Sequence, residues 1–236
     1  MEKLIYAGKA KQVWTTKQEQ VLRIVYLDQV TALNGKRKDQ IKGKGQISNE
    51  ISSLIFQFLS KNGIPTHYLK TISDNEELVK RVQIIPLEMV VRNVIAGHFA
   101  SRFGLEEGKQ LKKPVEEMYY KSDELDDPFI NESQVLALGF ATQDELAQMW
   151  AISRKVNKLL TGMFRDAGLK LVDFKLEFGR TSDGDIILAD EFSPDNARLW
   201  DIKTSEKMDK DVYRQHTGGL ASTYQDVLDR LQGVIA

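Results

Sequence analysis

Apolar and charged side chains alternate with a period of two residues along the segment from Leu171 to Gly179. A strand places every second side chain on the same face, so this pattern predicts a β-strand with three charged groups in a row. Those groups are Asp173, Lys175 and Glu177. A second apolar run, from Ile186 to Phe192, follows closely enough to pair with the first. The sequence therefore predicts a hairpin that carries charge on one face.

The dipeptide Asp183-Gly184 between the two runs is a strong signal for a two-residue hairpin turn. Such a turn would set Glu177 directly opposite Asp190, with Cβ atoms about 5 Å apart. A four-residue turn would keep both carboxylates on one face, whereas an odd loop or a bulge would separate them. Two carboxylates so placed repel each other, and Mg²⁺ with its preference for oxygen ligands would stabilise the pair. The alternative is an amphipathic hairpin with a solvated face and no site.

Length and composition restrict the remaining possibilities. A chain of 236 residues can form one large domain or two small ones. Its net charge of −1 gives no general reason to bind nucleic acid or a membrane surface. Cysteine is absent, which excludes disulfides and thiolate chemistry and is compatible with a reducing compartment. No apolar run has the length of a signal peptide core or a membrane span, so we expect a cytoplasmic protein.

The first ninety residues are dominated by predicted strands. We expect strands at residues 3–6, 13–14 and 21–27, followed by a basic, glycine-bearing loop region between Asn34 and Gly45. Ser48 is a good N-cap for a helix that ends at Gly63. The apolar run from Val82 to Val91 contains Pro86, which predicts an edge strand or a break, and we place a hinge between two domains there.

The second half of the chain predicts two long helices. Thr142 and Glu145 have the spacing of a capping box, which opens a helix that ends at Gly168. A final helix at residues 220–231 is expected to pack onto the second domain.

Two further motifs predict anion binding. The turn Gly8 to Lys11 places two lysines between two strands, where they could cover a polyphosphate, although it matches neither a Walker loop nor a dinucleotide-binding fingerprint. A solvated surface hairpin is the alternative. Arg92 ends a strand and could bind a phosphate with two parallel bonds. The alternative is an arginine paired with Glu88 or Asp123.

Four blocks taken in order resemble the SAICAR synthetase family, the phosphoribosylaminoimidazole-succinocarboxamide synthases. The resemblance runs nearly end to end and is carried by residues 6–11, 85–92, 171–179 and 190–201. It implies an ATP-dependent ligase of purine biosynthesis that joins the carboxylate of carboxyaminoimidazole ribonucleotide (CAIR) to the amine of L-aspartate. It also implies two α+β domains with ATP between them. Residues 1–84 would cover the ATP phosphates, and residues 85–236 would bind metal and substrates.

The resemblance assigns a role to individual residues. Lys9, Ala10 and Lys11 would hold ATP phosphates, the backbone near Ile84 would contact adenine, and Glu177 with Asp190 would bind Mg²⁺. Asp173 and Lys175 would contact the ring or reacting carboxylate as catalytic residues, and Arg92 and Arg198 the ribonucleotide phosphate. Further substrate-binding positions are His98, Lys121, Asp127, Lys210 and Arg214. His98 stands where the family usually has serine, so phosphate affinity here would depend on the protonation of imidazole.

The implied reaction has a chemical requirement. A carboxylate does not react with an amine in water, so ATP would first convert it to an acyl phosphate, which the amine of L-aspartate then attacks. A small-molecule kinase with the same ATP cleft is the rival enzyme. A nucleic-acid-binding module that uses residues 36–44 is a rival of another class, which the net charge disfavours. The sequence does not fix the oligomeric state; a homodimer is the expected assembly.

Overall fold

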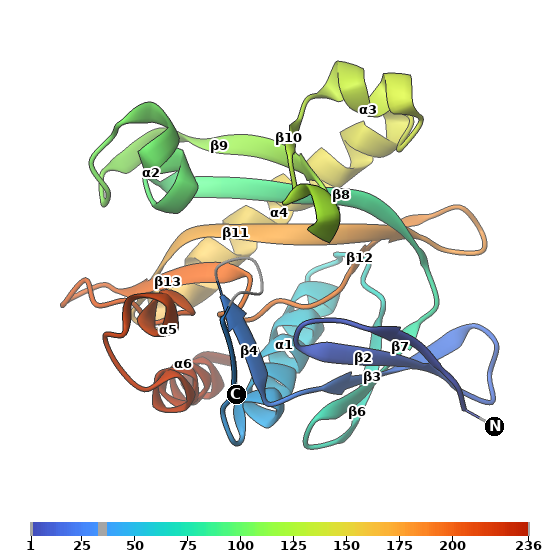
Figure 1. Ribbon diagram of the computed structural model, residues 1–236, viewed down its shortest axis with the longest axis horizontal. Coiled ribbons are helices and arrows are strands. Elements are labelled where there is room, and N and C mark those ends of the chain that lie inside the picture. The colour runs from blue at the N-terminus through green and yellow to red at the C-terminus, as the bar shows by residue number, and fades with distance from the viewer. Residues whose placement is uncertain (1, 33–36, 236) are drawn as a thin grey trace.

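A computed structural model describes residues 2–32 and 37–235 (Figure 1). A five-stranded antiparallel sheet has the order β1-β2-β3-β7-β6. Its strands are β1 (Leu4–Ala7), β2 (Lys11–Thr15), β3 (Val21–Tyr26), β6 (Tyr68–Ser73) and β7 (Glu76–Lys80). Every second residue of β3 is buried, because one face of the sheet covers a small apolar cluster. The three strands predicted in this region are confirmed.

The predicted basic loop region is wrong in part. Residues 37–40 form β5 (Arg37–Gln40), which pairs with β4 (Gln29–Ala32). Helix α1 (Lys44–Lys61) begins four residues before Ser48, because the carboxylate of Asp28 accepts hydrogen bonds from the amides of Gly43 (3.1 Å) and Gly45 (3.0 Å). The cap therefore comes from a residue remote in sequence. Asn34 to Lys36 of the predicted loop lie outside the described residues.

The second sheet has the order β10-β9-β8-β11-β12, and β13 also pairs with β11. Its strands are β8 (Gln83–Val94), β9 (Gln110–Tyr120), β10 (Phe129–Ile130), β11 (Leu169–Arg180), β12 (Ile186–Ala189) and β13 (Ala197–Asp201). The prediction of an edge strand or break at Pro86 is wrong, since β8 is continuous and internal. Pro86 lies at a register shift against β11, and its carbonyl accepts from the amide of Lys121 at 3.0 Å. A missing amide N–H is tolerated at such a position.

The long helices agree with the sequence prediction. Helix α4 (Gln143–Asp166) starts with a complete capping box between Thr142 and Glu145. Helix α6 (Leu220–Ile235) packs against α1 as well as α4 and a short helix, α5 (Asp211–Gln215). The contacts with α4 and α5 confirm that it packs onto the second part of the chain, and the contact with α1 adds a link to the first part. The remaining helices are α2 (Gly97–Phe103), the 3₁₀ helix η1 (Asp123–Leu125) and α3 (Glu132–Leu138).

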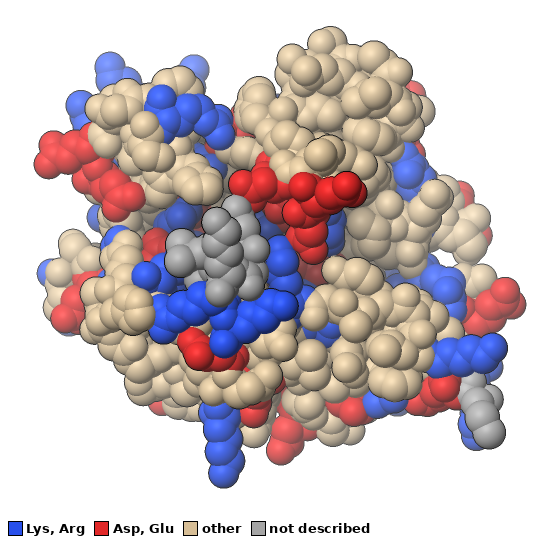
Figure 2. All heavy atoms as spheres, viewed as in Figure 1, with Lys and Arg blue, Asp and Glu red and all other residues tan. Residues whose placement is uncertain are grey.

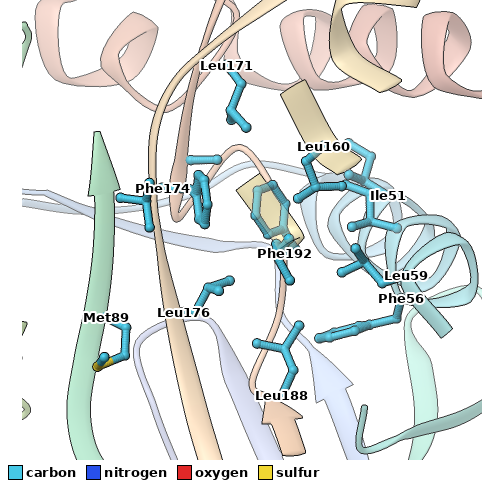
Figure 3. Packing of buried hydrophobic residues seen from close by; sticks show 14 of the residues in the cluster. Ile51, Phe56, Leu59, Met89, Leu160, Leu171, Phe174, Leu176, Leu188 and Phe192 are labelled. Carbon is cyan, nitrogen blue, oxygen red and sulfur yellow. The ribbon is translucent and has the colours of Figure 1, made fainter. Parts of the chain in front are cut away.

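One apolar core connects the two parts of the chain. Phe174 and Leu176 of β11 and Leu188 of β12 face Phe56 and Leu59 of α1 (Figure 3). Burial of such side chains contributes about 2–3 kcal/mol each and fixes the second sheet against α1. The division between residues 84 and 85 stays a prediction. Among the residues that the structure describes, no helix has both the length and the apolar character needed to span a membrane.

Candidate active site

A cleft of about 470 Å³ opens along the second sheet and beneath the β4–β5 hairpin. Nine residues selected from the sequence line it: Lys9, Arg92, His98, Asp127, Asp173, Lys175, Arg198, Lys210 and Arg214. On the face seen in Figure 2, basic and acidic side chains gather in the middle of the molecule, over β4 and the acidic segment near η1. The structure therefore brings together residues that lie more than 200 positions apart in the sequence.

The carboxylate hairpin differs from the predicted register by one residue. Glu177 lies opposite Ala189, because the loop between β11 and β12 has five residues, 181–185, and not two. An odd loop was expected to separate the two carboxylates. Asp190, however, follows the strand with φ of 63°, in the left-handed region, and its carboxylate reaches the same cluster of charges as Glu177. Asp190 is the leading electrostatic influence on Glu177.

Two lysines neutralise this pair. Lys11 pairs with Asp190 and, at 3.0 Å, with Glu191, and Lys121 pairs with Glu177. Burial and the Asp190 charge raise the pKa of Glu177, whereas Lys11 holds the pKa of Asp190 below its ordinary value despite burial. The repulsion that was expected to require a metal is thus offset by ammonium groups. Within residues 2–32 and 37–235, no three His, Asp or Glu side chains are arranged to bind one metal.

A buried histidine lies beside the backbone at Asp190. The amide of His67 donates to the carbonyl of Leu188 at 2.8 Å, so the segment before β6 pairs with β12. The imidazole is buried and lies within reach of the Asp190 backbone. Burial lowers the pKa of His67 to about 4, so the ring is neutral at pH 7.

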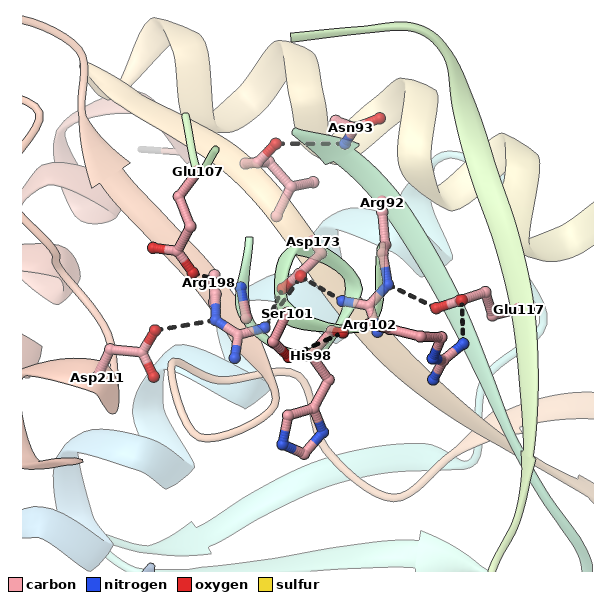
Figure 4. Close-up of polar contacts among 12 residues, drawn as sticks. Arg92, Asn93, His98, Ser101, Arg102, Glu107, Glu117, Asp173, Arg198 and Asp211 are labelled. Carbon is pink, nitrogen blue, oxygen red and sulfur yellow. Dashed lines mark hydrogen bonds and ion pairs between the residues drawn. The ribbon is translucent and has the colours of Figure 1, made fainter. Parts of the chain in front are cut away.

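Arginines and carboxylates alternate along the wall of the cleft (Figure 4). Arg92 is buried and donates to Glu117 at 2.6 Å and to Asp173 at 2.7 Å. Asp173 also accepts from Arg198 at 3.0 Å, and Arg198 donates to Asp211 at 2.9 Å. Arg102 also pairs with Glu117, and Arg214 pairs with Asp211. We call this series of alternating arginines and carboxylates the arginine ladder. Each guanidinium is therefore held in a fixed orientation before any ligand binds.

The predicted alternative partners of Arg92 are wrong. Glu88 pairs with Lys175, and Asp123 pairs with Lys9 at 2.6 Å on the surface. Burial of Arg92 beside β9 makes Glu117 its partner, because an unpaired guanidinium would be costly there. Lys175 and Glu88 face the cleft from β11 and β8.

Sequence reasoning missed a second cluster of charges. Lys44 is 1% exposed and pairs with Asp195, which also accepts a hydrogen bond from Tyr224 at 2.8 Å. Asp195 lies in the block 190–201 that resembles the family, whereas Lys44 was predicted to lie in a basic loop and nothing in its sequence pattern predicts its burial. Its burial withdraws Lys44 from the basic surface that a nucleic-acid-binding module would need.

Six predicted site residues do not line the cleft, namely Ala10, Lys11, Ile84, Lys121, Glu177 and Asp190. Ile84 is 41% exposed at the start of β8, and Ala10 belongs to the turn between β1 and β2. Lys121 follows β9 and contacts the cluster around Glu177. Lys121, Lys11, Glu177 and Asp190 form one cluster of charges.

The family model for SAICAR synthetase matches residues 4–231. The chain belongs to this family. It is 58% identical over 235 residues to the phosphoribosylaminoimidazole-succinocarboxamide synthase of Limosilactobacillus fermentum, covering 99% of this chain and 98% of the relative. The enzyme of Streptococcus pyogenes serotype M1 is 57% identical over 228 residues, covering 97% of each chain.

Solved structures of the SAICAR synthetase family share the fold. The enzyme of Ehrlichia chaffeensis is 41% identical with a TM-score of 0.96 and 98% coverage of both chains. A SAICAR synthetase in complex with ADP is 42% identical with a TM-score of 0.94 and 97% coverage of both. The predicted α+β class and the resemblance to this family are thus confirmed.

Proposed function

We propose that this protein uses ATP to join the carboxylate of CAIR to the amine of L-aspartate, which gives SAICAR, ADP and phosphate. The observation that carries this proposal is the placement of the arginine ladder beside a neutralised carboxylate pair in a member of this family. Lys11 and Lys121 at the carboxylate pair would bind phosphates of ATP, and Arg198 of the ladder would bind the phosphate of CAIR. Membership of a ligase family does not favour the small-molecule kinase alternative.

The carboxylate pair is the proposed magnesium site. Glu177 is buried and Asp190 is partly buried, and Mg²⁺ usually binds one or two carboxylates together with substrate phosphates. A bound Mg²⁺ ion would neutralise charge on the transferring phosphoryl oxygens. Lys11 and Lys121 already offset the carboxylate charges, so MgATP would exchange ammonium contacts for metal contacts. Lys9 and the Ala10 backbone would cover the phosphates, and Ile84 would lie near adenine.

Arg198 is the proposed phosphate ligand of CAIR, with Arg92 behind it. Both guanidinium groups are bonded to carboxylates, but Arg92 is buried whereas Arg198 is partly exposed to the cleft, so the main effect of Arg92 is to hold Asp173 in place. His98, at the start of α2, lines the same end of the cleft. Lys175 and Asp173 would contact the reacting carboxylate or ring, and positioning of the reactants would supply much of the rate.

The test is phosphate release with CAIR and MgATP, measured with and without L-aspartate, together with mass detection of SAICAR. Aspartate-dependent release of one phosphate per SAICAR supports the ligase. A stable phosphorylated product without aspartate would favour the kinase instead. Omission of Mg²⁺ should abolish turnover.

A homodimer in the cytoplasm is part of the same proposal. The edge strand β1 exposes Leu4, Ile5 and Tyr6, and such an edge is a surface that a second copy could cover. Light scattering of the purified protein gives the assembly, and cell fractionation gives the compartment. A monomer at micromolar concentration would contradict the dimer.

A further inference from the structure

Tyr26 lies beside Lys11, one of the two lysines at the carboxylate pair. The two residues are directly opposite each other in β3 and β2, so their side chains project from the same face of the five-stranded sheet. Nζ of Lys11 lies 5.8 Å from the centre of the Tyr26 ring. This distance allows a cation–π interaction, in which the negative face of an aromatic ring attracts an ammonium group. Lys11 therefore has an aromatic partner on its own sheet.

The carboxylate partners of Lys11 come from a different sheet. Asp190 and Glu191 follow β12 and both pair with Lys11, while Glu177 of β11 adds a weaker attraction. If Asp190 binds Mg²⁺, as proposed, Lys11 loses that partner. The face of a neutral ring is no ligand for Mg²⁺, which prefers oxygen. The contact with Tyr26 is therefore one that Lys11 keeps when the carboxylates bind the metal.

The hydrogen bonds of Tyr26 fix its ring in place. The hydroxyl donates to Oε1 of Glu77 at 3.1 Å, and burial together with the Glu77 charge raises the pKa of Tyr26, so the phenol keeps its proton. The backbone amide of Tyr26 donates to the carbonyl of Asn75 at 2.8 Å, and the carbonyl of Tyr26 accepts from Nδ2 of Asn75 at 3.0 Å. The side chain is buried. The ring is thus a rigid surface for Lys11 before any nucleotide binds.

We infer that Tyr26 is a positioning residue for Lys11, because its ring holds the ammonium group where the phosphates of ATP bind. This inference rests on the proposed function, in which Lys11 binds phosphates of ATP. Tyr26 is buried in the sheet and acts through Lys11. Loss of the ring should therefore weaken the binding of the nucleotide phosphates. The binding of adenine, CAIR and L-aspartate should not change.

The experiment compares wild type, Tyr26→Leu, Tyr26→Phe and Phe164→Leu in steady-state SAICAR formation. Phe164 of α4 is a fully buried aromatic residue of the large apolar core and is the matched control for loss of a ring. We expect Tyr26→Leu to raise KM for ATP about 10-fold, the effect of losing a buried cation–π interaction. KM for CAIR and for L-aspartate should change less than about 2-fold, as should all three constants in Tyr26→Phe and Phe164→Leu. Equal rises in all three KM values of Tyr26→Leu would overturn the inference.

Fluorinated rings separate the cation–π contact from a packing role. Fluorine withdraws electron density from the face of a ring and changes its shape little, so the attraction to an ammonium group weakens. Two proteins are compared, with phenylalanine or 3,4,5-trifluorophenylalanine in place of Tyr26. The fluorinated protein should have a KM for ATP about 3-fold higher, and this pair gives the answer if Tyr26→Leu does not fold. Equal KM values for ATP with the two rings would overturn the inference.

Calorimetric titration with MgADP and with adenosine shows whether Tyr26 acts through Lys11. Lys11→Met should weaken MgADP binding about 10-fold or more and adenosine binding less than about 2-fold. Tyr26→Leu should weaken MgADP binding about 10-fold in the wild-type background and less than about 2-fold in the Lys11→Met background, whereas multiplied effects would overturn the inference.

Failure of the proposed function gives a different result. If the reaction itself is wrong, wild type and Phe164→Leu form no SAICAR from CAIR, MgATP and L-aspartate. If only the inference is wrong, both proteins are active, Lys11→Met loses affinity for MgADP, and Tyr26→Leu keeps the wild-type affinity.

Discussion

Replacement of Glu77 by glutamine should stabilise the protein at neutral and alkaline pH. Glu77 is fully buried in β7, and its Oε1 accepts from the hydroxyl of Tyr26 at 3.1 Å. Its other oxygen has no hydrogen-bond partner among the described residues. Burial is the main cause that raises the pKa of Glu77 from 4.5 to about 8. The folded protein therefore keeps the proton at pH 7, where the unfolded chain has lost it.

The magnitude follows from proton linkage. Because the folded-state pKa lies above the unfolded-state value, wild type loses stability as pH rises from about 4.5 to about 8. Each pKa unit is worth about 1.4 kcal/mol, so the loss is about 3 kcal/mol at pH 7 and at most about 5 kcal/mol above pH 8. Glutamine keeps the acceptor for Tyr26 and does not ionise, so Glu77→Gln avoids this loss.

Urea unfolding of Glu77→Gln and wild type at pH 5, 7 and 8.5 measures the effect. The difference in free energy of unfolding should be below about 1 kcal/mol at pH 5 and grow to about 3 kcal/mol at pH 7. Glu76→Gln is the control, because Glu76 is partly exposed and pairs with Arg23 at 2.9 Å. A constant difference for Glu77→Gln across this range would refute the reasoning. KM for ATP should stay within about 2-fold, since protonated Glu77 adds no charge beside Lys11.

Three further predictions concern the site and its support. Glu177→Gln should lower kcat by about 100-fold or more with an unchanged circular dichroism spectrum, and near-normal activity at low Mg²⁺ would contradict the metal assignment. Gly97→Ala should raise KM for CAIR about 10-fold. Gly97 has φ of +55°, and a Cβ at this position would collide with Nη2 of Arg198. An unchanged KM for CAIR would contradict this role of Gly97. The Arg180 hydrogen bond lowers the pKa of Glu145 to about 2, so Glu145→Gln should lose about 1–2 kcal/mol of stability at pH 7 in urea unfolding. That loss of stability should disappear as pH falls from about 4.5 towards 2, because Glu145 of wild type then becomes protonated. A loss that persists at pH 2 would show that the ionised Glu145 is not its cause.

Local signals in the sequence determined much of the fold. The alternation from Leu171 to Gly179 fixes β11, since a period of two places charge on one face whatever the rest of the chain does. The Thr142 capping box acts within four residues and correctly begins α4. Both features depend on neighbours in the chain, so a sequence contains the information needed to predict them.

Tertiary structure decided how the site is assembled. The Glu177–Asp190 pair survives a register shift of one residue only because Asp190 adopts a left-handed backbone, next to the strand pairing of His67 with β12. Arg92 takes Glu117 as its partner, and Lys44 is buried on Asp195, because packing of the sheets and α1 brings those groups together. A buried charge pairs with whatever opposite charge the fold places beside it, and spacing along the chain does not encode that choice.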